Sequence, residues 1–194
     1  MIILGISGSP TSGSSTDLLI NAVLEGASVN HVKTRFIKLN ELNILPCQAC
    51  GKSPEPDFCF FHDDMDDLYS LMAKADAVVL GSPIYFDSVS AQTKIFIDRA
   101  NCLRPLDFSV TDESRFKKPL FEGKKGGIIL VGGNKFDSAS RTARAFFIWA
   151  GMERVFEMNY LSTGNDAGSV GSDLGKLDMA RNYGKELLAA ISKK

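Results

Sequence analysis

The sequence of 194 residues has no basic excess, because 22 Lys and Arg side chains are balanced by 23 Asp and Glu side chains. That balance argues against binding to nucleic acid or to an anionic membrane surface. No stretch approaches the roughly 18 apolar residues that a membrane-spanning helix needs. The apolar run at 1–6 is too short for a signal peptide and has no basic region before it. We therefore expect a cytoplasmic protein.

Cysteine is scarce, and three of the four cysteines lie between positions 47 and 59. Without an export signal, we expect reduced thiols or metal ligands rather than a disulfide framework. The sequence also has no internal repeat and no low-complexity tract. Its length and its 44% hydrophobic content predict a single domain over 1–194.

Apolar runs alternate with amphipathic stretches along the chain. The runs predict strands at 2–7, 31–38, 76–82, 126–132 and 153–161. The amphipathic stretches predict helices at 15–28, 64–74, 89–101, 137–150 and 172–192. Such alternation is typical of an α/β fold in which helices cover both faces of a mostly parallel sheet. Two connections, at about 40–63 and 102–124, are much longer than ordinary α/β loops, so each is expected to be functional or part of an interface.

The predicted strands differ in how apolar and polar residues are arranged along them. Those at 2–7, 76–82 and 126–132 are continuously apolar, as expected for strands covered on both faces. Those at 31–38 and 153–161 alternate with polar residues, which favours edge positions. We therefore predict a flavodoxin-like, doubly wound, five-stranded parallel sheet in the order 2-1-3-4-5.

The loop after the first strand is dense in hydroxyl groups and contains no Lys or Arg. Its hydroxyl residues are Ser7, Ser9, Thr11, Ser12, Ser14, Ser15 and Thr16. Because a helix follows at once, hydroxyl groups and helix N-terminal amides together predict a phosphate site. The alternative is a flexible loop in which Ser14 or Ser15 merely caps the helix.

The loop motif excludes two common nucleotide sites. Gly8 and Gly13 have the spacing of a nucleoside-triphosphate P-loop, but Ser14 stands where its lysine belongs. The glycine pattern of dinucleotide-binding proteins is also missing. A flavin mononucleotide, with a single phosphate, is the ligand that remains, and we do not expect FAD.

Two more loops follow strands at the same predicted edge. After the third strand come Pro83, Ile84, Tyr85 and Phe86, which could wall a flat apolar ring. Tyr85 and Phe86 could equally be core or dimer residues. After the fourth strand, Gly132 and Gly133 would let the backbone approach a ligand or simply form the turn.

In these motifs the sequence resembles the NAD(P)H-dependent FMN reductases, a group of flavodoxin-like proteins, and within it the iron-sulfur flavoprotein branch. The motifs that carry the resemblance are Gly8-Ser9-Pro10, Ser14-Ser15-Thr16, Cys47-Gln48-Ala49-Cys50, Asp63-Asp64-Met65, Ala75-Asp76-Ala77, Gly81 to Phe86, Lys94, Asp98-Arg99, Gly132-Gly133 and Gly151-Met152.

The resemblance implies FMN as a cofactor and NAD(P)H as a co-substrate. It implies that Ser9, Thr11, Ser14, Ser15 and Thr16 hold the phosphate. The ring would then lie against Pro83, Ile84, Tyr85 and Phe86, with Gly132 and Gly133 near its other edge. The resemblance also implies a homodimer or homotetramer, ion-pairing rather than flavin-contacting roles for Lys94, Asp98 and Arg99, and a helix cap at Asp64.

The cysteine segment departs from the cluster motif of that branch. The frame reads Cys47-x2-Cys50-x2-Ser53-x5-Cys59, so serine occupies the third ligand position. Iron-sulfur clusters are normally held by four thiolates, so we favour a remnant loop with reduced thiols. A labile cluster on Cys47, Cys50 and Cys59 and a zinc site completed by His62 remain alternatives.

The function predicted on this basis is an FMN-dependent oxidoreductase that takes hydride from NAD(P)H. Its electrons would pass to a small acceptor such as a quinone, a flavin, a nitro or azo compound, or a metal centre. Because the cofactor performs the chemistry, we expect no catalytic acid or base among the side chains. Two alternatives remain: an electron carrier fed by a partner reductase, and an FMN-binding sensor without turnover.

Overall fold

The computed structural model describes residues 1–29, 31–50, 58–107, 109–162 and 167–193. Its strands are β1 (Ile2–Ser7), β2 (Lys33–Lys38), β3 (Ala77–Tyr85), β4 (Ser88–Val89), β5 (Lys125–Gly132) and β6 (Glu153–Leu161). Its α-helices are α1 (Ser15–Ala27), α2 (Met65–Lys74), α3 (Ala91–Arg99), α4 (Asp137–Ala150) and α5 (Leu174–Ser192). The predicted elements are all present, with boundaries that shift by at most a few residues.

The sheet has the order β2-β1-β3-β5-β6, and neighbouring strands along this path are parallel. This is the predicted flavodoxin-like order, confirmed once the short additional strand β4 is taken out of the numbering. The two strands with alternating sequences, β2 and β6, lie at the edges as predicted. In the described part of the chain, β1 and β3 are almost entirely buried, which explains their continuous apolar sequences.

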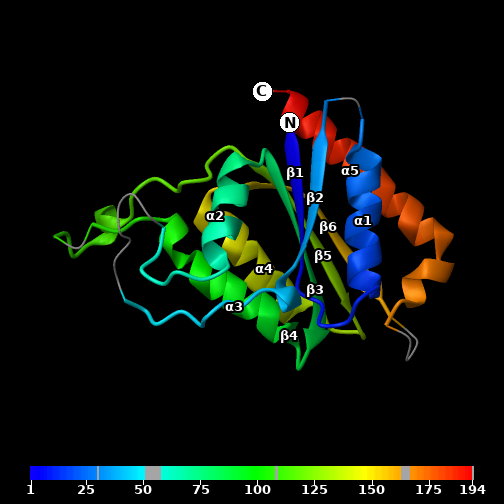
Figure 1. Cartoon of the computed structure of the whole chain (residues 1–194), viewed down its shortest axis with the longest axis horizontal. Coiled ribbons are helices and arrows are strands. Elements are labelled where there is room, and N and C mark those ends of the chain that lie inside the picture. Colours follow the sequence, from blue (N-terminus) through cyan, green and yellow to red (C-terminus); the bar gives the residue numbers. More distant parts are fainter. Residues whose placement is uncertain (30, 51–57, 108, 163–166, 194) are drawn as a thin grey trace.

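Helices cover both faces of the sheet (Figure 1). On one face, α1 and α5 pack over the sheet through a core that includes Leu19, Ile20 and Leu187. On the other face, α2, α3 and α4 contribute Met65, Phe96 and other side chains to a second core. Among the described residues, no helix is both long and apolar enough to cross a bilayer.

Strand β4 was not predicted. It pairs antiparallel with the end of β3, and Phe86 and Asp87 form the turn with φ angles of 49° and 63°. Two-residue turns of this kind usually contain Asn or Gly, because both central residues need positive φ. Since Phe86-Asp87 contains neither, the hairpin is not evident from the sequence.

The described parts of the two long connections pack on the face of α2, α3 and α4. Ile44 and Phe58 from the first connection lie against this core, and Phe121 from the second is buried in it. Arg99, at the end of α3, binds the first connection through an ion pair and a hydrogen bond. Its guanidinium pairs with Asp63 at 2.5 Å and donates to the carbonyl oxygen of Leu45 at 2.9 Å.

The start of α2 differs in detail from the sequence prediction. Asp64 occupies the cap position, but its carboxylate does not accept from the helix and instead accepts from the amide of Asn43 at 2.7 Å. Asp63 supplies the capping contact, because its Oδ1 accepts from the amide of Met65 at 3.0 Å. Two consecutive aspartates make this exchange of roles invisible in the sequence.

Candidate functional site

The loop between β1 and α1 is held by its own polar groups. Ser14 caps α1, since its hydroxyl accepts from the amide of Asp17 at 3.2 Å. The loop also meets the start of α3, where the Ser90 hydroxyl donates to the carbonyl oxygen of Gly8 at 2.7 Å. Gly8 is required here, because a Cβ at this position would collide with Thr93. The loop is therefore wedged between two helix N-termini.

A cavity of about 300 Å³ opens over this loop at the carboxyl edge of the sheet. Its lining residues are Ser9, Thr11, Ser14, Ser15, Thr16, Pro83, Ile84, Tyr85, Val131, Gly132, Gly133, Ser162 and Ala167. Ten of these are the residues that the sequence singled out after the first, third and fourth predicted strands. They meet because parallel strands present their carboxyl ends at one edge of the sheet.

Thr16 is the most informative of these residues. It is buried, it lines the cavity, and within the described chain its hydroxyl oxygen has no hydrogen-bond partner. A buried hydroxyl without a partner costs about 1–3 kcal/mol, so such groups call for an explanation. A ligand with oxygen acceptors in this cavity would provide the missing partner.

Ser15 has a different environment from the one predicted. Its amide donates to the carbonyl oxygen of Ala167 at 2.5 Å, and its hydroxyl accepts from the amide of Val170 at 3.1 Å. Although Ser15 lines the cavity, its polar groups therefore tie down the segment after β6. That segment contributes Ser162 and Ala167 to the wall, and the sequence analysis missed both. The position of β6 beside β5 was the signal that could have revealed them.

Phe86 does not join the other predicted residues. It lies at the tip of the β3–β4 hairpin and is completely exposed, outside the set that lines the cavity. The hairpin turn directs it away from the site, whereas the preceding Tyr85 lines the cavity and is 48% exposed. In its own chain, Phe86 therefore does not form a wall of the site.

A buried ion pair lies directly behind the loop between β1 and α1. Lys38, the last residue of β2, pairs with Asp17 on α1 at 2.8 Å, and each side chain is only 6% exposed. The Lys38 ammonium also donates to the carbonyl oxygen of Thr11 at 2.6 Å. The sequence analysis found no basic residue in the loop, and it missed that β2, at a distance along the chain, supplies one.

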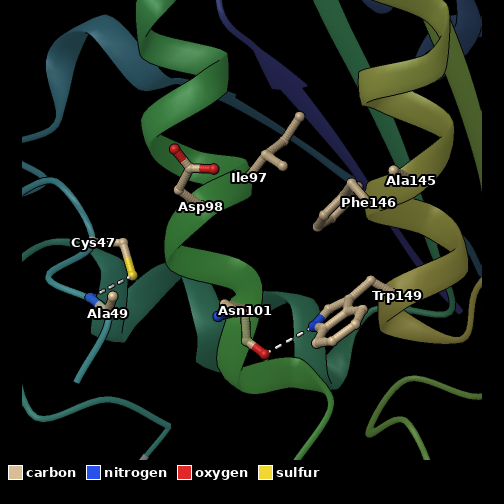
Figure 2. Close-up of a pocket in the computed structure, with 8 residues that line it drawn as sticks. All are labelled: Cys47, Ala49, Ile97, Asp98, Asn101, Ala145, Phe146 and Trp149. Atoms are coloured by element: carbon tan, nitrogen blue, oxygen red, sulfur yellow. Dashed lines mark hydrogen bonds between the residues drawn. The ribbon is translucent and has the colours of Figure 1, made fainter. Parts of the chain in front are cut away.

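The cysteine segment lies on the other side of α3. Cys47 and Ala49 line a second cavity of about 450 Å³ between α3 and α4, together with Ile97, Asp98, Asn101, Ala145, Phe146 and Trp149. Figure 2 shows the indole of Trp149 donating to Asn101, with Ile97 and Phe146 between the two helices. Among the described residues that line this cavity, Asp98 carries the only carboxylate, and it is paired with Lys94 at 2.7 Å.

The donor set near these cysteines does not form a metal centre in the part of the chain that is described. No group of three or more His, Cys, Asp or Glu side chains there could hold a metal ion. Cys47, Cys50 and Cys59 take part in no disulfide. Ser53, the position that departs from the cluster motif, lies outside the described residues. His62 pairs with Asp66 at 3.1 Å.

The surroundings of Arg99 shift the pKa values of the titratable groups beside it. Burial by itself would raise the pKa of the Asp63 carboxyl, but hydrogen bonds from Arg99 and from the amides of Leu45 and Met65 hold it below its usual range. Burial raises the pKa of the Cys102 thiol to about 11. Cys102 is therefore a protonated thiol at neutral pH.

Comparison with known proteins agrees with this architecture. The model of the NADPH-dependent FMN reductase family matches residues 1–166. An iron-sulfur flavoprotein of Methanocaldococcus jannaschii is 32% identical over 200 residues, covering 98% of this chain and 97% of that one. A putative NAD(P)H-dependent FMN-containing oxidoreductase of Bacillus subtilis is 27% identical over 135 residues, covering 69% of this chain and 68% of its own.

Solved structures support the fold independently. A flavone reductase superimposes with a TM-score of 0.75 at 20% identity, over 99% of this chain and 63% of that chain. A flavodoxin from the domain Archaea superimposes with a TM-score of 0.60 at 14% identity, over 99% of both chains. Similarity at such identities concerns the fold alone, whereas the family model extends over most of the sequence. This chain belongs to the NADPH-dependent FMN reductase family, and it is a flavin-dependent oxidoreductase with a flavodoxin-like fold.

Proposed function

We propose that the chain binds FMN in the cavity at the carboxyl edge of the sheet and catalyses electron transfer from NAD(P)H to a small acceptor. The observation that carries this proposal is Thr16, which lines the cavity at the N-terminus of α1 and whose buried hydroxyl has no hydrogen-bond partner among the described residues. Phosphate oxygens are strong acceptors, and a helix N-terminus favours an anion. The residues present therefore fit the phosphate of FMN.

The composition of the cavity suits a monophosphate and a flat ring. Among the described residues that line it there is no Lys, Arg, Asp or Glu. Hydroxyl groups from Ser9, Thr11 and Ser14 surround the loop side. Pro83, Ile84 and Tyr85 provide the apolar side, and Gly132 and Gly133 leave room for a ring edge.

When bound, FMN supplies the redox chemistry, accepting hydride from a reduced nicotinamide and returning electrons to an acceptor. The side chains around it bind and orient. Tyr85 is about half exposed at the mouth of the cavity, so this side is open to an approaching nicotinamide or acceptor.

The test begins with the flavin itself. Flavin released from the purified protein should be FMN and not FAD. Anaerobic addition of NADH or NADPH to the loaded protein should then bleach the flavin absorption within the turnover time. Bleaching only after addition of a separate reductase would favour the electron carrier, and flavin that never bleaches would favour a sensor.

We propose further that the cysteine segment is a remnant loop, and that the working protein needs only flavin. The support is the serine at position 53, which stands in place of the third thiolate of the cluster motif. The second candidate, an iron-sulfur flavoprotein, is favoured by the relative from Methanocaldococcus jannaschii and by Cys47, Cys50 and Cys59. Iron analysis and the visible spectrum of protein purified without oxygen separate the two.

We also propose that the protein forms a homodimer or homotetramer. The support is Phe86, a completely exposed aromatic side chain at the tip of a hairpin beside the cavity. Single exposed apolar side chains are ordinary on protein surfaces, so Phe86 supports the proposal through its place on the hairpin beside the cavity and not through its exposure alone. A second copy that covers Phe86 would bring this ring close to the mouth of a flavin site.

A further inference from the structure

We call the loop between β1 and α1, which we propose binds the phosphate, the phosphate loop. Two opposite charges are buried beside it, outside the cavity. Lys38 is not among the cavity-lining residues, yet its ammonium contacts the wall from behind through the carbonyl oxygen of Thr11. Its other partner, Asp17, is equally buried. A buried ion pair has to be explained, because removing two charges from water costs several kcal/mol per ion.

Asp17 connects both ends of the loop. One carboxylate oxygen accepts from the Ser7 hydroxyl at 2.5 Å, before the loop. The other accepts from the Gly13 amide at 3.1 Å, near the loop's end, and from Lys38. The carboxylate therefore fixes the loop in one conformation and positions the amides and hydroxyls around the cavity.

The same carboxylate creates an electrostatic problem. Asp17 lies in the first turn of α1, the turn whose N-terminus we propose binds the phosphate. A buried negative charge there would repel a phosphate that carries almost two negative charges at neutral pH. Lys38 offsets this charge, and it does so without entering the cavity.

We propose that Lys38 is a positioning and specificity-determining residue, which neutralises Asp17 and thereby lets the loop select phosphorylated over unphosphorylated flavin. The inference rests on the proposed function, since it requires that the loop binds the phosphate of FMN. It assigns to the ion pair a role that goes beyond stability. Riboflavin lacks the phosphate, so its binding should not depend on Lys38.

The test measures the dissociation constants of FMN and riboflavin for the full-length chain freed of flavin, by quenching of flavin fluorescence. Lys38→Met should weaken FMN binding about 10- to 100-fold, the scale of a lost interaction with a charged group, and change riboflavin binding less than about threefold. Asp17→Asn leaves Lys38 unopposed, so it should increase the preference for FMN. The double variant Asp17→Asn with Lys38→Met should return to a preference close to that of the wild type.

Lys33→Met is the matched control, because it makes the same substitution at the exposed other end of β2. It should leave both dissociation constants unchanged. If Lys38→Met weakens FMN and riboflavin equally, or if Asp17→Asn lowers the preference as much as Lys38→Met does, the pair only holds the loop and the inference is wrong. A wild-type chain that binds riboflavin as tightly as FMN would instead overturn the proposed phosphate site itself. The double variant buries no unpaired charge, so it remains informative if either single variant does not fold.

Discussion

Replacing Thr16 with valine should have opposite effects on flavin binding and on the stability of the flavin-free protein. Valine keeps the β-branched shape of threonine and removes the hydroxyl. In the described structure that hydroxyl is buried and has no hydrogen-bond partner. The flavin-free protein therefore loses no hydrogen bond and no longer has to bury a polar group.

The two magnitudes follow from that environment. A buried polar group without a partner costs about 1–3 kcal/mol, and a replacement of the same shape should recover about 1 kcal/mol of it. A hydrogen bond to a charged acceptor contributes about 1.5–3 kcal/mol, so its loss should weaken FMN binding roughly 10- to 150-fold. Urea unfolding of the flavin-free chain and FMN titration measure the two quantities separately.

Thr142→Val provides the control, since Thr142 donates to the carbonyl oxygen of Ser138 within α4. This substitution should slightly destabilise the protein and leave FMN affinity unchanged. If Thr16→Val destabilises the flavin-free chain, its hydroxyl has a partner in solution. If the variant binds FMN like the wild type, the phosphate does not lie at this hydroxyl.

Three other substitutions test the surroundings of the site. Arg99→Met leaves the Asp63 carboxylate buried and unpaired, so it should lower the free energy of unfolding by about 3–5 kcal/mol in urea titration. Because the pKa of Asp63 is depressed in the folded state, the pair stabilises the protein above about pH 4, and this stabilisation is lost as the pH falls further. If the stability of Arg99→Met falls with decreasing pH as steeply as that of the wild type, this explanation is wrong. Ser53→Cys should increase the amount of iron that the protein binds on anaerobic reconstitution, because thiolate is a better ligand than serine. A full cluster already present in the wild type would refute the hypothesis that the cysteine segment is a remnant loop. Phe86→Ser should shift the oligomer towards the monomer in light scattering, and an unchanged mass would remove the hairpin from the interface.

The sequence predicted the elements and the site where local chemistry was decisive. The apolar runs of β1, β3 and β5 are continuous because these strands are covered on both faces. Ser14 caps α1 as its type and position suggested. The order of the strands brings three separate loops to one edge, so most of the residues that line the cavity are evident from the sequence.

What the sequence could not provide depends on contacts between distant segments. Lys38 precedes the cysteine segment and bears no sequence relation to the phosphate loop, yet its ammonium reaches Thr11. The polar groups of Ser15 are used by residues after β6, which a reading of the first loop alone cannot reveal. Phe86 was assigned to the flavin wall on its residue type, but the positive φ of its turn decides where it points.

Helix α3 connects the proposed phosphate site with the connection that contains the cysteines. At its N-terminus, the Ser90 hydroxyl bonds to the phosphate loop through the carbonyl oxygen of Gly8. At its C-terminus, Arg99 holds the connection that contains the cysteines, through Leu45 and Asp63. Helix α3 therefore provides one route by which a change at the cysteine segment can reach the loop between β1 and α1. The chain itself provides another, because Lys38 at the end of β2 and Asn40 at the start of the first connection donate to the carbonyl oxygens of Thr11 and Pro10. Loss of the Arg99 contacts should therefore loosen the cysteine segment, while the Ser90 contact keeps the phosphate loop in place.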